Sequence, residues 1–246
     1  MERIAEICCG SLEDVLIAQK AGADRIELNS AMYLGGLTPS VGTIKLISEK
    51  CCIPIIAMVR PRPGGFYYND YEFQTMLADI ESMMDYNIQG FGCLDRDGSI
   101  DKEKSSMIIE IIHNSNKEAV FHRAFDCVKN PYEAIEILIN LGVKRVLTSG
   151  LKSKAVEGVD LLAKLQNKYG DKIEILAGSG VNASNCSYLI NETGIVQYHS
   201  SCKSWRTDPT TIGNISFAYG EPPHERDYDI VSYHEAIKFV TRVKKI

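Results

Sequence analysis

Short apolar runs, each bounded by turn residues, alternate along the chain with longer amphipathic segments. Eight of these runs have the length of buried strands, and they cover residues 3–9, 25–29, 54–60, 89–94, 119–124, 145–149, 173–178 and 196–200. Nearly continuous apolar strands that alternate with helices are typical of parallel sheets covered by helices. The pattern therefore predicts eight successive βα units.

Start and stop signals of helices fit the same units. Ser11 stands at a capping position and Pro131 at a first helical position, whereas Gly22 and Gly142 stand where a left-handed helix end is needed. An open doubly wound sheet should have a glycine-rich first βα turn, but only Gly10 and Ser11 follow the first strand. The sequence predicts an α/β fold with a closed TIM-type (β/α)₈ barrel.

The domain organisation follows from length and from the absence of a linker. The 246 residues are close to what one barrel needs, and no stretch rich in Pro, Gly or Ser divides them. We expect one domain over residues 1–246, with a barrel core over 3–201 and a tail over 202–246. The tail is expected to be irregular over 202–228 and helical over 230–244. It forms either a lid over the open face of the barrel or a surface loop that leads to a closing helix.

Composition and charge exclude several classes of function. The net charge of -5 is spread over the chain, so no basic patch indicates nucleic-acid binding. No apolar run approaches the roughly 18 to 20 residues of a membrane span, and no export signal opens the sequence. We therefore expect a cytoplasmic protein whose eight cysteines are reduced thiols. The lack of a CxxC motif counts against a zinc ribbon or a thioredoxin-type centre.

Charged residues inside the strands are the first candidates for chemistry. Side-chain alternation turns Glu6 of the first strand and Glu27 of the second strand toward the barrel interior. Buried carboxylates require a cationic partner, and Arg60 and Arg62 follow the third strand. Two interpretations stay open: a structural Glu–Arg network, or an arginine clamp for an anionic substrate beside a carboxylate that transfers protons.

The later strand ends carry a second group of candidates. His122, Arg123 and Asp126 could act as acid or base, anion binder and orienting carboxylate, or as a core histidine followed by a turn cap. Small residues after the seventh and eighth strands either bind phosphate through backbone amides or only form tight turns. The candidate catalytic residues are thus Glu6, Glu27, His122 and Asp126, and the candidate substrate-binding residues are Arg60, Arg62, Arg123, Ser149, Gly178, Ser179, Gly180, His199 and Ser200.

Several uncommon strings give the chain a family resemblance. They are GADRIEL at 22–28, GGLTPS at 35–40, MVRPRPGGFYY at 58–68, FHRAFD at 121–126 and RVLTSG at 145–150. In order and spacing they resemble the CutC family over about residues 6–201, without the tail. This resemblance implies a cytoplasmic TIM-barrel protein of copper homeostasis that binds copper through cysteines near the strand ends.

The resemblance makes Cys8 the candidate ligand for Cu(I), which favours soft thiolate and thioether donors. Asn29 and Ser200 stand where members of the family can carry cysteine, and Cys202 is a candidate replacement. Cys93 and Cys127 are the other thiols expected near strand ends.

Three functional hypotheses result. The first is copper binding in copper homeostasis. The second is an enzyme of lyase, isomerase or hydrolase type that acts on a small anionic metabolite, for example a phosphorylated one, through acid, base and arginine residues at the carboxyl ends of the strands. The third is an interaction surface in a homo-oligomer, an assembly common among such barrels, although no interface signature stands out in the sequence.

Overall fold

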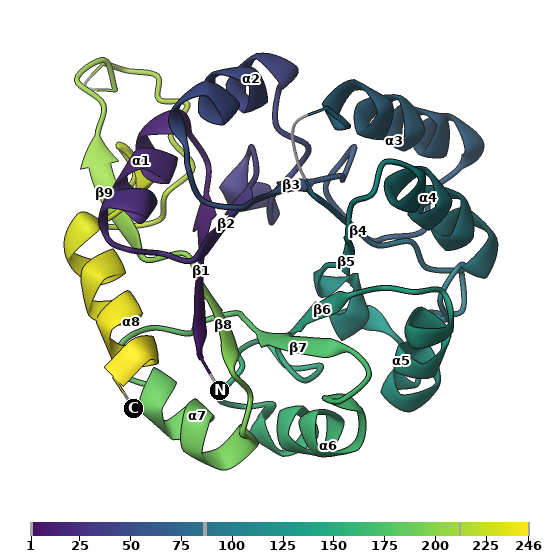
Figure 1. Cartoon of the computed structure of the whole chain (residues 1–246). Helices are drawn as coiled ribbons and strands as arrows, with labels where there is room; N and C mark the ends of the chain where they lie inside the picture. Colours follow the sequence, from purple (N-terminus) through teal and green to yellow (C-terminus); the bar gives the residue numbers. More distant parts are fainter. Residues whose placement is uncertain (1, 86–87, 212, 246) are drawn as a thin grey trace.

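Eight parallel strands close into a barrel that is surrounded by helices (Figure 1). The computed structural model describes residues 2–85, 88–211 and 213–245. Neighbours in the barrel follow chain order from β1 to β8, and β8 pairs with β1. The strands are β1 (Ile4–Cys9), β2 (Arg25–Leu28), β3 (Ile55–Met58), β4 (Ile88–Phe91), β5 (Ala119–Phe121), β6 (Arg145–Thr148), β7 (Glu174–Ala177) and β8 (Gln197–Ser200). The predicted TIM-type (β/α)₈ fold is confirmed.

The helices begin and end at the predicted signals. Ser11 accepts a hydrogen bond from the backbone N–H of Asp14 at 3.1 Å, and Gly22 and Gly142 have φ angles of 84° and 82°. The helices are α1 (Leu12–Lys20), α2 (Val41–Lys50), α3 (Asp70–Met83), α4 (Lys102–Asn114), α5 (Pro131–Asn140), α6 (Val159–Tyr169), α7 (Cys186–Thr193) and α8 (Tyr233–Lys245). Every helix in the described part of the chain falls short of the length or hydrophobicity needed to cross a bilayer.

The strand register decides which side chains enter the barrel. Glu6 lies opposite Arg25 of β2 and opposite His199 of β8, and Cys8 lies opposite Glu27. These polar side chains share the inner face, because side chains along a strand alternate between faces. Ile7, between Glu6 and Cys8, is fully buried in the hydrophobic core. The predicted inward orientation of Glu6 and Glu27 is confirmed.

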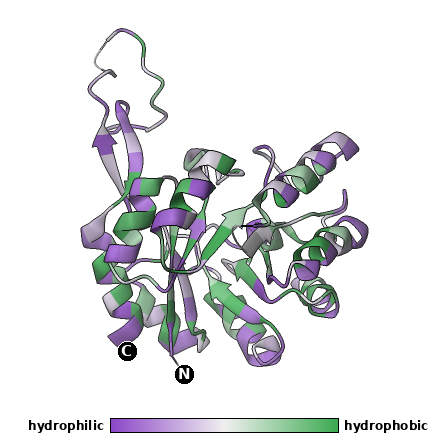
Figure 2. Ribbon diagram, turned by 45° about the horizontal axis from the view of Figure 1, so that its top comes forward, coloured by the Kyte–Doolittle hydropathy of each residue, from purple (hydrophilic) through white to green (hydrophobic). Residues whose placement is uncertain are grey.

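The tail contains a hairpin that the sequence pattern did not predict. Strands β9 (Lys203–Thr207) and β10 (Asp227–Val231) pair antiparallel, although the segment over 202–228 was expected to be irregular. Strand β10 also occupies the expected start of the last helix at residue 230, so that helix begins at Tyr233 instead. The connection between them projects away from the barrel (Figure 2). Arg206 binds Glu13 of α1 at 2.7 Å, and Asp14 of α1 accepts a hydrogen bond from the N–H of Val231 at 2.7 Å. The hairpin is thus anchored on α1, and α8, yellow in Figure 1, packs beside α1 and α7.

Aromatic side chains connect this hairpin segment to a loop at the barrel mouth. Tyr219 stacks on Tyr33, with ring centroids 4.1 Å apart. Tyr33 belongs to a short 3₁₀ helix, η1 (Met32–Leu34), in the connection between β2 and α2. Trp205 of β9 lies 5.9 Å from the Tyr219 ring. The tail therefore supports the loop that carries Met32.

Candidate functional site at the mouth of the barrel

A cavity of about 340 Å³ opens at the carboxyl ends of the strands. Its size is within the range of small-ligand sites. Apolar surface comes from Met32, Met58, Phe66 and Leu147, and ionisable side chains come from Cys8, Glu27, Arg60, His122, Arg123, Asp126, Cys127 and His199. Of the described residues after Ser201, none lines it, so the described part of the tail contributes nothing to the wall of this opening.

Cys8, Glu27 and His199 form a compact donor cluster on one side of the cavity. One ligand atom from each of the three lies within 4.8 Å of the others. The Sγ of Cys8 lies 3.5 Å from Oε2 of Glu27 and 3.7 Å from Sδ of Met32. Burial, with the nearby charge of Glu27, raises the pKa of the Cys8 thiol well above its ordinary value. Without a bound cation the thiol is therefore protonated.

Glu6 orients His199 from below the cavity. Nδ1 of His199 lies 2.7 Å from Oε1 of Glu6, whereas its Nε2 lies 3.9 Å from Oε2 of Glu27. Burial by itself lowers the pKa of His199, but the hydrogen bond to Glu6 and the charge of Glu27 raise it above its ordinary value. Metal-binding histidines commonly donate their second ring N–H to a carboxylate in this way.

The predicted pairing of these carboxylates with Arg60 and Arg62 is wrong. Glu6 forms a buried ion pair with Arg25, and the Oε1 of Gln197 accepts hydrogen bonds from Arg25 at 2.8 Å and from Arg145 at 2.9 Å. The register explains the difference, since Glu6 lies directly opposite Arg25. Glu27 lies level with Ile56, four positions before Arg60.

Arg60 and Arg62 have different surroundings. Arg60 is buried and donates to the carbonyls of Leu34 at 2.9 Å, Gly36 at 3.0 Å and Gly64 at 2.8 Å. Arg62 turns away from the cavity and pairs with Glu72. Of the two arginines, only Arg60 lines the cavity.

His122 follows β5, which ends at Phe121 rather than at residue 124. Its Nδ1 accepts the backbone N–H of Ala124 at 3.0 Å. Burial, with a smaller contribution from the charge of Arg60, lowers the pKa of His122 to about 3. The ring is therefore neutral and carries its proton on Nε2, which has no hydrogen-bond partner among the described residues.

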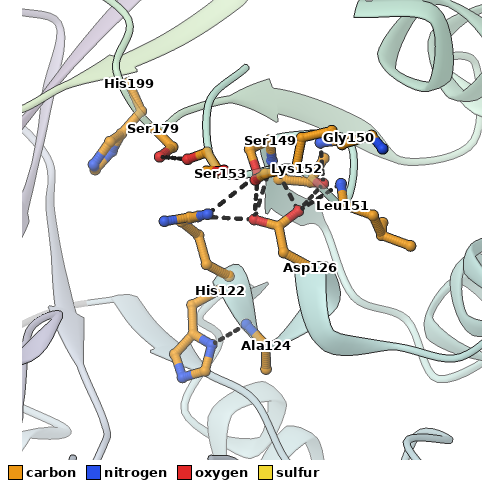
Figure 3. A network of polar contacts seen from close by, with 12 residues as sticks. His122, Ala124, Asp126, Ser149, Gly150, Leu151, Lys152, Ser153, Ser179 and His199 are labelled. Carbon is orange, nitrogen blue, oxygen red and sulfur yellow. Dashed lines mark hydrogen bonds and ion pairs between the residues drawn. The ribbon is translucent and has the colours of Figure 1, made fainter. Parts of the chain in front are cut away.

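The carboxylate of Asp126 is occupied by structural hydrogen bonds (Figure 3). It accepts from Oγ1 of Thr148 at 2.6 Å, from the N–H of Ser149 at 2.9 Å and from the N–H of Leu151 at 3.2 Å. Nε of Arg123 also donates to it, at 2.8 Å. These contacts hold Asp126 in place and make it an anchor for Arg123. Ser149 belongs to this anchor and does not line the cavity.

The small residues after β7 and β8 are only partly in the cavity wall. Ser179 and Gly180 line it and have φ angles of 76° and 70°. Gly178 does not line it, and a Cβ there would lie 2.6 Å from Cδ1 of Leu147, so this glycine is required by packing. Ser200 lines the cavity, but its hydroxyl donates to the carbonyl of Val181 at 2.6 Å.

Most of the other sulfur atoms lie away from the donor cluster. Cys202 is buried in the hydrophobic core and lines a separate cavity, so it does not replace a ligand at Ser200. Cys93 is also buried outside the cavity wall, whereas Cys127 is exposed at its edge. Met32 was missed by sequence reasoning, because it lies in a loop. Two features of the sequence could have identified Met32 as a candidate ligand: its thioether group, and its position four residues after the end of β2.

The sequence is similar to a known family and to several of its members. A sequence profile described as CutC family matches residues 3–204. The chain belongs to the CutC family. A CutC family protein from Treponema denticola is 44% identical over 239 residues, which cover 96% of both chains. The human copper homeostasis protein cutC homolog is 38% identical over 219 residues, covering 88% of this chain and 80% of its own.

A solved structure agrees with the CutC assignment. The crystal structure of CutC from Streptococcus agalactiae has a TM-score of 0.75 at 31% identity, and the match covers 81% of this chain and 98% of that one. N-(5′-phosphoribosyl)anthranilate isomerase from Pyrococcus furiosus has a TM-score of 0.59 at 17% identity, covering 99% of this chain and 100% of that one, which reflects the shared barrel fold alone. The family match ends at residue 204, so most of the β9–β10 hairpin and all of α8 lie outside it.

Proposed function

We propose that this CutC protein binds Cu(I) at Cys8, Met32 and His199 and acts in cytoplasmic copper homeostasis. The supporting observation is the 3.7 Å approach of the Cys8 thiol and the Met32 thioether next to the His199 ring. Thiolate and thioether sulfur are donors that Cu(I) prefers. The name of the human relative, copper homeostasis protein cutC homolog, supports the same role.

The surrounding residues fit a bound cation. Glu6 fixes Nδ1 of His199 at 2.7 Å and leaves Nε2 on the side of Cys8 and Glu27. Asn29, which stands where family members can carry cysteine, donates from Nδ2 to Sγ of Cys8 at 3.2 Å and to Oε2 of Glu27 at 2.9 Å. Asn29 therefore supports the ligands instead of acting as a third sulfur donor. The negative charge of Glu27 adds to the attraction for a cation.

Native mass spectrometry of the reduced, metal-depleted protein during anaerobic Cu(I) titration tests this proposal. The wild type should retain one copper ion, and Cys8→Ser should retain none. Cys52→Ser is the matched control, because Cys52 is an exposed thiol that precedes β3 and so lies at the opposite end of the barrel. Equal copper retention by wild type and Cys8→Ser would contradict the proposal.

A second candidate function is an enzyme of lyase, isomerase or hydrolase type that acts on a small anionic metabolite. It is favoured by the charge of Arg60, which is buried in the cavity wall without a carboxylate partner among the described residues. Glu27 and His199 would then act as acid and base. A panel of phosphate esters and carboxylic acids tests this function: turnover by the wild type that is lost in Glu27→Gln would support it. Equal turnover by both proteins would exclude these roles.

A further inference from the structure

The cavity has a cationic wall in addition to the donor cluster. We use this name for the guanidiniums of Arg60 and Arg123 together with the neutral ring of His122, which follow β3 and β5. In the closed strand order, β5 lies across the barrel from β1, which carries Cys8, whereas β3 is the neighbour of β2, which carries Glu27. The cavity thus combines two chemistries: sulfur, carboxylate and imidazole at the donor cluster, and hydrogen-bond donors at the cationic wall.

Arg60 is the strongest indication of an anionic ligand. Its side chain is 94% buried, and its protein acceptors are the neutral carbonyls of Leu34, Gly36 and Gly64. Its Nε has no hydrogen-bond partner among the residues that the structure describes. Buried charges in proteins are normally paired, because an unpaired charge costs several kcal/mol to bury. A counter-charge is therefore expected from the ligand.

His122 and Arg123 add donors to the same wall. His122 is 98% buried, and its Nε2–H is not used by any described residue. Arg123 is held by Asp126 through Nε and by Ser149 through Nη2, at 2.8 and 3.1 Å. This leaves Nη1 of Arg123 without a described partner, on a side chain that is 42% exposed. A fixed guanidinium with a free edge is suited to carboxylate or phosphate oxygens.

The ring of Phe66 packs beside two members of the cationic wall. It lies 5.1 Å from the guanidinium carbon of Arg60 and 5.1 Å from the His122 ring. With Met58 and Leu147 it gives the cavity an apolar lining beside the cationic wall and the donor cluster. A ligand with one charged end and a small organic body matches this division.

We infer that the cationic wall binds the oxyanion end, carboxylate or phosphate, of a small organic ligand whose body lies over Phe66 and extends toward Cys8 and His199. This inference specifies the ligand of the second candidate function. Any reaction of that ligand rests on the proposed enzyme activity. Anion binding itself requires no copper, since neither Arg60 nor Arg123 belongs to the donor cluster.

Binding of inorganic phosphate and of acetate to the metal-depleted protein tests the inference. Both titrations are followed by the ¹⁵N signals of the histidine rings and by isothermal calorimetry. We expect a saturable shift of the Nε2–H signal of His122. Arg123→Gln should raise the Kd by about tenfold or more, the scale of one charged hydrogen bond. Arg96→Gln is the matched control, because Arg96 is exposed on the Tyr67 ring outside this cavity and should bind as the wild type does.

The outcomes separate the two anion classes and the two proposals. Saturable binding of phosphate alone supports a phosphate ester, and binding of acetate alone supports a carboxylate. If neither anion shifts the His122 signal, or if Arg96→Gln weakens binding as much as Arg123→Gln does, the inference is overturned. Copper retention by the same wild-type sample is measured in parallel, so a failure of anion binding is distinguished from a failure of the copper proposal. Arg60 is left unchanged, because its three carbonyl contacts hold two loops in place.

Discussion

Replacement of Glu6 by Gln removes a negative charge from the centre of the barrel. Glu6 is 1% exposed and lies between the Arg25 guanidinium and the His199 ring. The variant keeps the shape of the side chain but removes the charge that neutralises Arg25. The other acceptor of Arg25 among the described residues, the amide oxygen of Gln197, is neutral. We expect a large loss of stability, because breaking one half of a buried pair leaves the other charge uncompensated.

The magnitude follows from the pKa of Glu6. Burial alone would raise this pKa, but Arg25 and His199 lower it from the ordinary 4.5 to about 2. Each pKa unit corresponds to about 1.4 kcal/mol, so ionisation of Glu6 stabilises the fold by about 3 kcal/mol. Mutational losses at buried ion pairs, about 3 to 5 kcal/mol, are of the same order.

Urea unfolding at pH 7, followed by far-ultraviolet circular dichroism, measures the effect. We expect Glu6→Gln to lower the free energy of unfolding by about 3 kcal/mol. Glu13→Gln is the control, since its ion pair with Arg206 is largely exposed and such pairs contribute up to about 1 kcal/mol. A loss below about 1 kcal/mol in Glu6→Gln would refute the argument that the network is structural.

Three further predictions concern neighbouring positions. The wild type should lose stability as the pH falls from about 6.5 to 2, because the folded state lowers the pKa of His122 to about 3 and that of Glu6 to about 2; urea midpoints that stay constant over this range would contradict it. Gly92→Ala should cost about 1 to 3 kcal/mol in thermal unfolding, since the new Cβ would lie 2.5 Å from Cε1 of His122, whereas Gly65→Ala, with no atom within 4 Å, should be nearly neutral. Met32→Leu should cost less than about 1.5 kcal/mol of stability and yet weaken Cu(I) retention in competition with a chelator; unchanged retention would remove Met32 from the proposed ligands.

Strand parity was enough to predict the inner face of the barrel. Glu6 and Glu27 were placed there from alternation alone, and the structure shows Glu6 beside His199 and Glu27 beside Cys8. The same rule would have placed Arg25 beside Glu27, two positions away on the same strand. Arg25 was not chosen as the partner of Glu6, because alternation specifies which face of a strand a side chain occupies but not the register of that strand against its neighbour. In a closed barrel this register is set by the stagger of the strands.

Loops and the tail were harder to predict for a different reason. Met32 reaches Cys8 through a 3₁₀ turn with left-handed residues at both ends, Ala31 at φ 46° and Gly35 at φ 86°. Apolar periodicity carries no information on such a path. Strand β9 carries Lys203, Trp205 and Arg206 on a partly exposed ribbon, so it lacks the buried apolar run by which the eight barrel strands were found.

The position of Trp205 decides what an optical experiment on this protein reports. It is the only tryptophan in the sequence, and it lies on β9, stacked on His224 at 4.7 Å and below the Lys203 ammonium at 4.2 Å. Its emission therefore follows the structure of the hairpin segment, while circular dichroism follows the barrel and its helices. A fluorescence transition that precedes the dichroism transition would reveal unfolding of the hairpin on an intact barrel, a step that either signal alone would hide.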